Sequence, residues 1–141
     1  MIPISVRWVG DATGHLDILD QTQLPGRLGW VACTDVDTVV EAIKSLRVRG
    51  APAIGIAGAY GLVVAATEAL RAGWPPAQAR AHVLARGEEL ASARPTAVNL
   101  RWAVERSLGK LATLPADAPA GALADALLAE VVIRLESETT P

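Results

Sequence analysis

The first third of the chain has the alternating pattern of short β-strands. From position 4 to position 8 every second residue is apolar, which is typical of a half-buried strand. Two further apolar runs, at 15–20 and 30–33, are set off by stretches rich in Gly, Pro and Asp. Because short loops join antiparallel rather than parallel strands, the pattern predicts a small antiparallel sheet of about three strands.

From residue 34 the apolar period changes to that of helices. Thr34 or Asp35 is suited to cap a first helix, Pro52 to begin a second and Gly73 to end it. The pattern predicts five helices, at about 35–46, 52–72, 76–93, 96–111 and 121–138. We therefore expect an α+β fold, with a β segment at 1–34 and a helical part of the same domain at 35–141.

Composition and charge narrow the classes of function. Of the 141 residues 51% are hydrophobic and 20% charged, and the net charge is −2 without a run of basic residues. We therefore expect a globular protein that does not bind nucleic acid. The uncharged stretch 51–66 is shorter than the roughly 20 residues that cross a bilayer, so we expect a buried helix and no membrane. A single Cys and the lack of a secretory leader favour the cytoplasm.

A first candidate binding motif lies where the second predicted helix begins, at residues 47–55 (RVRGAPAIG). Helix starts present unpaired N–H groups and a positive dipole end, which suit an anion. Gly50 and Ala51 let a ligand approach the backbone, and Arg49 can hold a phosphate through two N–H groups. An ordinary helix–helix turn with exposed arginines has the same pattern.

A second candidate motif lies at residues 94–100 (RPTAVNL). Arg94 again stands beside a helix start, which Thr96 is placed to cap. Two such starts in one small domain can converge on one phosphorylated ligand. A capped turn with an exposed arginine is the alternative.

Three glycines, Gly55, Gly58 and Gly61, recur at a spacing of three inside the second predicted helix. Each costs about 1 kcal/mol in a helix interior relative to Ala, so the stripe needs a reason. Because apolar residues flank it, close packing of another backbone is favoured over close approach of a ligand. The chain has neither a Gly-x-Gly-x-x-Gly fingerprint nor a P-loop.

The remaining polar candidates give weaker signals. Cys33 is expected to be a buried structural thiol, and no metal partners can be assigned to His15 or His82. Glu88 and Glu89 are expected on a solvated helix face. Four aspartates are expected in turns and caps without an acid–base partner: Asp17, Asp20, Asp35 and Asp37.

The two motifs, with the longer run 45–61, resemble the family of methylthioribose-1-phosphate isomerases. That family also includes ribose-1,5-bisphosphate isomerases and regulatory subunits of translation initiation factor 2B. The similarity is closest to the catalytic isomerases. It implies conversion of a ring-closed aldose phosphate to a ketose in methionine salvage, without a dissociable cofactor. It also implies that Arg49, Gly50, Ala51 and Arg94 contact the sugar phosphate.

The resemblance further implies a longer, homodimeric protein. Family members continue into a Rossmann-like carboxy-terminal domain that supplies the catalytic Cys and Asp, which are absent from these 141 residues. Cys33 is not that catalytic Cys, because the residues around it match a different part of the family's sequence pattern. We therefore expect the chain to bind the sugar phosphate poorly and not to turn it over by itself. The alternatives are a non-catalytic module that binds a phosphate metabolite or a partner chain, and a domain only marginally stable alone.

Overall fold

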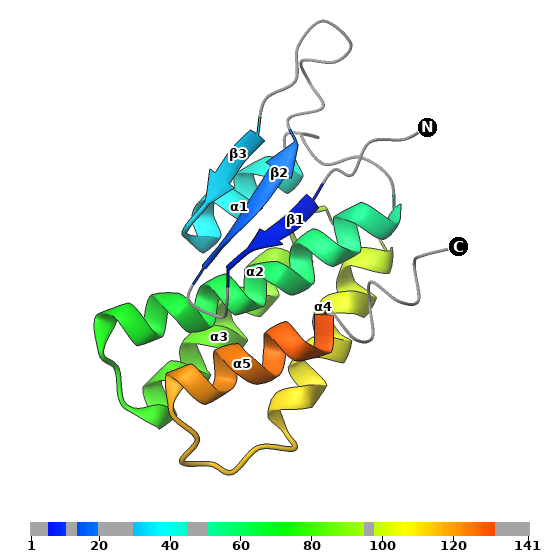
Figure 1. Ribbon diagram of the computed structural model, residues 1–141. Coiled ribbons are helices and arrows are strands. Elements are labelled where there is room, and N and C mark those ends of the chain that lie inside the picture. The colour runs from blue at the N-terminus through cyan, green and yellow to red at the C-terminus, as the bar shows by residue number, and fades with distance from the viewer. Residues whose placement is uncertain (1–5, 11–13, 20–29, 45–50, 95–97, 132–141) are drawn as a thin grey trace, which may run out of the picture.

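Three short strands form the sheet that the alternation predicts. The computed structural model describes residues 6–10, 14–19, 30–44, 51–94 and 98–131 (Figure 1). Strands β1 (Val6–Val9), β2 (His15–Leu19) and β3 (Trp30–Cys33) pair antiparallel in chain order. Trp8 lies opposite Leu16, and Leu16 lies opposite Cys33, so these three side chains share one face of the sheet.

Five helices follow the sheet in the part of the chain that the structure describes, so the α+β class is confirmed. Their bounds are α1 (Val36–Lys44), α2 (Ala51–Ala72), α3 (Pro76–Ala91), α4 (Val98–Leu111) and α5 (Ala120–Glu130). The ends differ slightly from the predicted ones: α3 ends at Ala91, two residues early, and α5 begins one residue early. The predicted continuation of α5 to residue 138, and the predicted cap Thr96, lie outside the described residues.

Helix α2 is the centre of the molecule. Among the described elements it contacts the four other helices and strands β1 and β2, and Figure 1 shows the sheet on one side of it and α4 and α5 on the other. Every described side chain from Ile54 to Thr67 is buried, which explains why the helix is apolar all round. It is long and apolar enough to cross a membrane, but 83% of its apolar window is buried inside the protein, as in a soluble core helix.

The helix ends follow the local chemistry of their residues. Asp35 Oδ1 accepts a 2.7 Å hydrogen bond from the Thr38 N–H, which caps α1 as predicted. Gly73, at φ +72°, closes α2: its N–H donates to Leu70 O, and the Trp74 N–H donates to Ala69 O. This pair of bonds satisfies carbonyls that the last turn of a helix leaves open.

The glycine stripe of α2 packs closely against neighbouring helices, but of its three glycines Gly55 alone makes the predicted contact with another backbone. A Cβ added at Gly58 would overlap Leu100 Cδ1 of α4, and one at Gly61 would lie 2.7 Å from Leu90 Cδ2 of α3. The three glycines do not face one neighbour, however. Positions three apart on a helix differ by about 60° in direction, so the stripe turns from α4 towards α3 along α2.

Candidate functional site

The starts of α2 and α4 lie side by side at one end of the molecule (Figure 1). A Cβ placed on Gly55, in the second turn of α2, would lie 3.1 Å from the backbone oxygen of Asn99, in the first turn of α4. Further along, Gly58 contacts Leu100 and Val104. The neighbours in α4 move from Asn99 and Ala103 at Gly55 to Leu100 and Val104 at Gly58. Both helices therefore advance in the same direction, and their amino-terminal ends point the same way. The two positive dipole ends, with the N–H groups that have no acceptor within their own helix, therefore face a common region.

Arg94 lies at the bend between α3 and α4, four residues before α4 begins. Its side chain is half-buried. Within the described ranges, no hydrogen bond or ion pair engages this guanidinium, whereas the other arginines with described side chains all have partners. Those partnered arginines are Arg71, Arg80, Arg86, Arg101 and Arg106. Arg94 is thus the described arginine whose charge stays available for an anion.

The other predicted site residues are less completely described. Arg49 and Gly50 lie outside the described residues. Ala51 is the first residue of α2, so its backbone N–H belongs to the helix start that faces α4. The assignment of Arg49, Gly50, Ala51 and Arg94 to a phosphate site stays a prediction.

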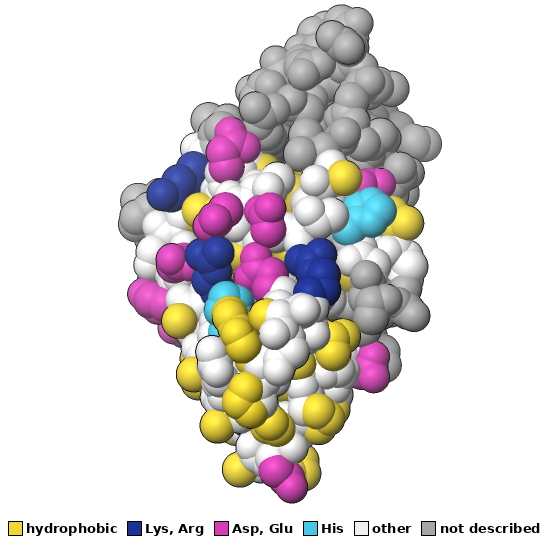
Figure 2. Space-filling model, turned by 90° about the vertical axis from the view of Figure 1, so that its left-hand side faces the viewer, with side chains coloured by type: hydrophobic (Ala, Val, Ile, Leu, Met, Phe, Trp, Pro, Cys, Tyr) yellow, Lys and Arg dark blue, Asp and Glu magenta, His cyan; other side chains and the backbone are white. Residues whose placement is uncertain are grey.

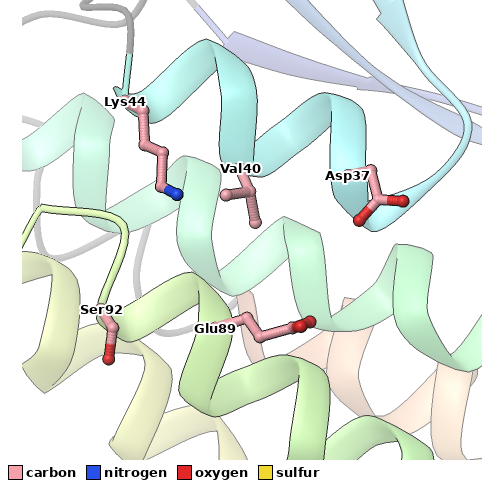
Figure 3. Close-up of a pocket in the computed structure, with 5 residues that line it drawn as sticks. All are labelled: Asp37, Val40, Lys44, Glu89 and Ser92. Atoms are coloured by element: carbon pink, nitrogen blue, oxygen red, sulfur yellow. The ribbon is translucent and has the colours of Figure 1, made fainter.

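A shallow groove of about 370 Å³ separates α1 from α3 (Figure 3). Asp37 and Glu89 mark one end, Lys44 and Ser92 the other, and Val40 lies between them. The negative charge of the acidic end is offset in part, because Arg86 binds both Asp37 and Glu89. The Lys44 end leads along the chain to residues 45–50, and Ser92 leads to Arg94.

Sequence reasoning missed a polar cluster around Glu68, at the far end of α2. Glu68 Oε1 lies 2.8 Å from His82 Nε2 and 3.8 Å from Arg86 Nε, and Oε2 accepts a 2.9 Å bond from the Val36 N–H. Figure 2 shows acidic, basic and histidine side chains gathered on this face. Seventeen residues separate Glu68 from Ala51, roughly 25 Å along a helix, so this cluster is remote from the helix starts.

The interpretation of Asp17 was wrong. It lies in the middle of strand β2 and not in a turn, is 9% exposed, and has a partner: Oδ1 is 3.0 Å from His15 Nε2. Residues two apart in a strand point to the same face, so the pair could have been found from its spacing.

Cys33 is a buried thiol, as predicted. Its side chain is inaccessible, and burial, together with the charges of Asp35, Asp17 and Glu41, raises its pKa to about 12. A thiol this difficult to ionise does not act as a nucleophile at neutral pH. Glu88 and Glu89 are exposed, as expected, and pair with Arg101 and Arg86 respectively.

Known proteins share both the sequence and the fold. A methylthioribose-1-phosphate isomerase from Pelotomaculum thermopropionicum is 50% identical over 126 residues, which are 89% of this chain and 33% of that protein. The crystal structure of 5-methylthioribose 1-phosphate isomerase from Pyrococcus horikoshii OT3 matches with a TM-score of 0.81 and 29% identity, over 97% of this chain and 36% of that one.

A second solved structure matches equally well. Translation initiation factor eIF-2B, subunit delta, from A. fulgidus has a TM-score of 0.81 and 35% identity, over 95% of this chain and 36% of that one. The chain therefore spans about a third of the length of these relatives. The profile of the Initiation factor 2 subunit family matches residues 47–131, from the first candidate motif to the end of the described helices. The resemblance seen in the two motifs is confirmed, and the chain belongs to the Initiation factor 2 subunit family.

Proposed function

We propose that this chain is the amino-terminal, substrate-binding part of an aldose–ketose isomerase. The reaction is conversion of 5-methylthioribose 1-phosphate to 5-methylthioribulose 1-phosphate, a step of methionine salvage in the cytoplasm. The observation that carries the proposal is Arg94, a half-buried guanidinium without a partner among the described residues, four residues before the start of α4, which itself lies beside the start of α2. The 50% identity to a methylthioribose-1-phosphate isomerase supports this substrate.

In this proposal the phosphate binds where α2 and α4 begin. Backbone N–H groups of Ala51 and of the first turn of α4 donate to its oxygens, and Gly50 lets it approach closely. Arg49 and Arg94 add charge-assisted hydrogen bonds, which a planar guanidinium forms two at a time. The positive dipole ends of α2 and α4 attract the phosphate further.

Isomerisation also needs a group that moves a proton between two carbons. Cys33 is unsuited because its pKa of about 12 keeps the thiol protonated. We propose that the acid–base residues belong to the two thirds of the relatives' length that this chain does not cover. In this proposal the chain binds the phosphate, and the rest of the enzyme carries the residues that transfer the proton.

Mixing the chain with the remaining part of the P. thermopropionicum relative tests this division. We expect no turnover of methylthioribose 1-phosphate by the chain alone and turnover on mixing. Arg94→Ala should then lower kcat/KM about 10- to 100-fold, since a hydrogen bond to a charged group contributes about 1.5–3 kcal/mol. Arg101→Ala, which removes an exposed arginine bound to Glu88, is the matched control and should have little effect. Turnover by the chain alone would contradict the proposal.

A second candidate is a non-catalytic module that binds a phosphate metabolite or a partner chain. The equal structural match to a protein described as a translation initiation factor subunit favours it. Failure of the mixture to turn over substrate, with phosphate binding intact, would place this candidate first.

A further inference from the structure

Gly55 differs from the other helical glycines of the chain in what it faces. A Cβ at this position would lie 3.1 Å from the Asn99 backbone oxygen and 3.6 Å from the Asn99 carbonyl carbon. At Gly58, Gly61 and Gly87 the nearest atoms are the ends of leucine side chains. A buried leucine end can be displaced by repacking of its own side chain, at a cost in stability, but the carbonyl of Asn99 moves only if the first turn of α4 moves with it.

This contact lies next to the proposed phosphate site. Ala51, where α2 begins, is one turn before Gly55, and Asn99 is the second residue of α4. The distance between the two helix starts is therefore set by how closely the Gly55 backbone approaches the Asn99 carbonyl. Replacing the Gly55 hydrogen by a methyl group would separate the starts by a few tenths of an ångström.

We propose that Gly55 is a positioning residue, which holds the starts of α2 and α4 close enough to bind one phosphate together. The proposal rests on the proposed function, since it concerns the same phosphate site. Hydrogen bonds from N–H groups to an anion have a narrow range of length, about 2.7–2.9 Å. A site built from two helices is therefore sensitive to their separation, whereas a site on one helix is not.

Titration of the wild-type chain with inorganic phosphate, followed by ¹H–¹⁵N NMR, tests the first part. We expect the amides of Ala51 and Ala53 in α2 and those of Val98 and Asn99 in α4 to shift with one common dissociation constant. Two different constants would overturn the inference, because the helix starts would then bind separately. No shift at either start would overturn the proposed function, and this inference with it.

The same titration of Gly55→Ala tests the second part. The wider separation should leave the phosphate in contact with one helix start only. Phosphate binding should then weaken about two- to fivefold, which corresponds to losing the attraction of one positive dipole end. Gly58→Ala introduces a methyl group into the same helix interface but against a leucine end, and Gly109→Ala introduces one where nothing lies within 4 Å. Both controls should keep the wild-type affinity for phosphate.

The three variants separate positioning from general packing. Weaker phosphate binding in Gly55→Ala alone supports the inference. Wild-type affinity in Gly55→Ala overturns the inference and leaves the proposed function standing. An equal loss in Gly58→Ala also overturns it, because any disturbance of the α2–α4 interface would then suffice. If Gly55→Ala does not fold, the wild-type titration still decides whether the two starts bind as one site.

Discussion

The Val36 N–H donates a 2.9 Å hydrogen bond to Glu68 Oε2, so a side chain near the end of α2 satisfies the start of α1. The other carboxylate oxygen of Glu68 meets His82. Glu68→Ala would leave the Val36 N–H and His82 without this partner. We expect the free energy of unfolding to fall by about 1–3 kcal/mol, measured by urea denaturation.

Glu105→Ala is the control for that substitution. Glu105 is also a helical glutamate that pairs with an arginine, but its side chain is 63% exposed. Its removal should change stability by no more than about 0.5 kcal/mol. Equal effects of the two substitutions would show that the Glu68 cluster contributes nothing beyond a surface ion pair.

Asp35 should contribute stability that depends on pH. Hydrogen bonds from the Thr38 hydroxyl and N–H hold the pKa of Asp35 below its ordinary value, because both favour the ionised carboxylate. The contribution is therefore present above the ordinary pKa of an aspartate and is lost as the pH falls. We expect Asp35→Ala to cost about 1 kcal/mol at pH 7 and less at pH 3 in urea unfolding. Asp35→Asn, which keeps an acceptor without a charge, should show no such change with pH.

Cys33 should resist alkylation in the folded chain. With its pKa raised to about 12, almost none of the thiol is ionised at pH 8, so iodoacetamide should react far more slowly than in urea. Above the ordinary thiol pKa of 9.0 the unfolded chain loses this proton first, so folding stability should fall as the pH rises from there towards 12. Cys33→Ala should remove that part of the alkaline decline. Fast alkylation of the native chain would contradict the buried position.

Gly61 should be intolerant of a side chain, for a reason of packing and not of binding. A methyl group there would meet both δ carbons of Leu90 and lie 3.3 Å from Val39 Cγ1. We expect Gly61→Ala to destabilise the chain by about 1–3 kcal/mol. At Gly109 a methyl group meets nothing within 4 Å, so Gly109→Ala should be stabilising by about 0.4–1 kcal/mol. Thermal unfolding of both variants checks the difference in sign.

Local patterns were sufficient to predict most of the fold. The strand alternation, the cap at Asp35, the prolines at the starts of α2 and α3 and the left-handed Gly73 are all properties of neighbouring residues. The boundary errors at α3 and α5 are one or two residues, because helix ends fray and their last turn is often a 3₁₀ turn.

The sequence was less informative about contacts between distant residues. Glu68 reaches Val36 across 32 positions, and no periodicity links the two. The side-by-side position of the α2 and α4 starts follows from the Gly55–Asn99 contact, which is also long-range. Sequence reasoning could point to Arg94 as a phosphate ligand, but only the structure shows that every other arginine with a described side chain already has a partner.

A double-mutant cycle on Arg49 and Arg94 tests the central claim most directly, that two helix starts grip one phosphate. The quantity to measure is the dissociation constant of methylthioribose 1-phosphate for the wild-type chain, Arg49→Ala, Arg94→Ala and the double variant, from NMR titrations. If both guanidinium groups bind the same phosphate, the two losses should not add, with a coupling free energy of about 0.5–3 kcal/mol. Losses that add to within about 0.5 kcal/mol, or an Arg94→Ala variant that binds like wild type, would contradict the claim.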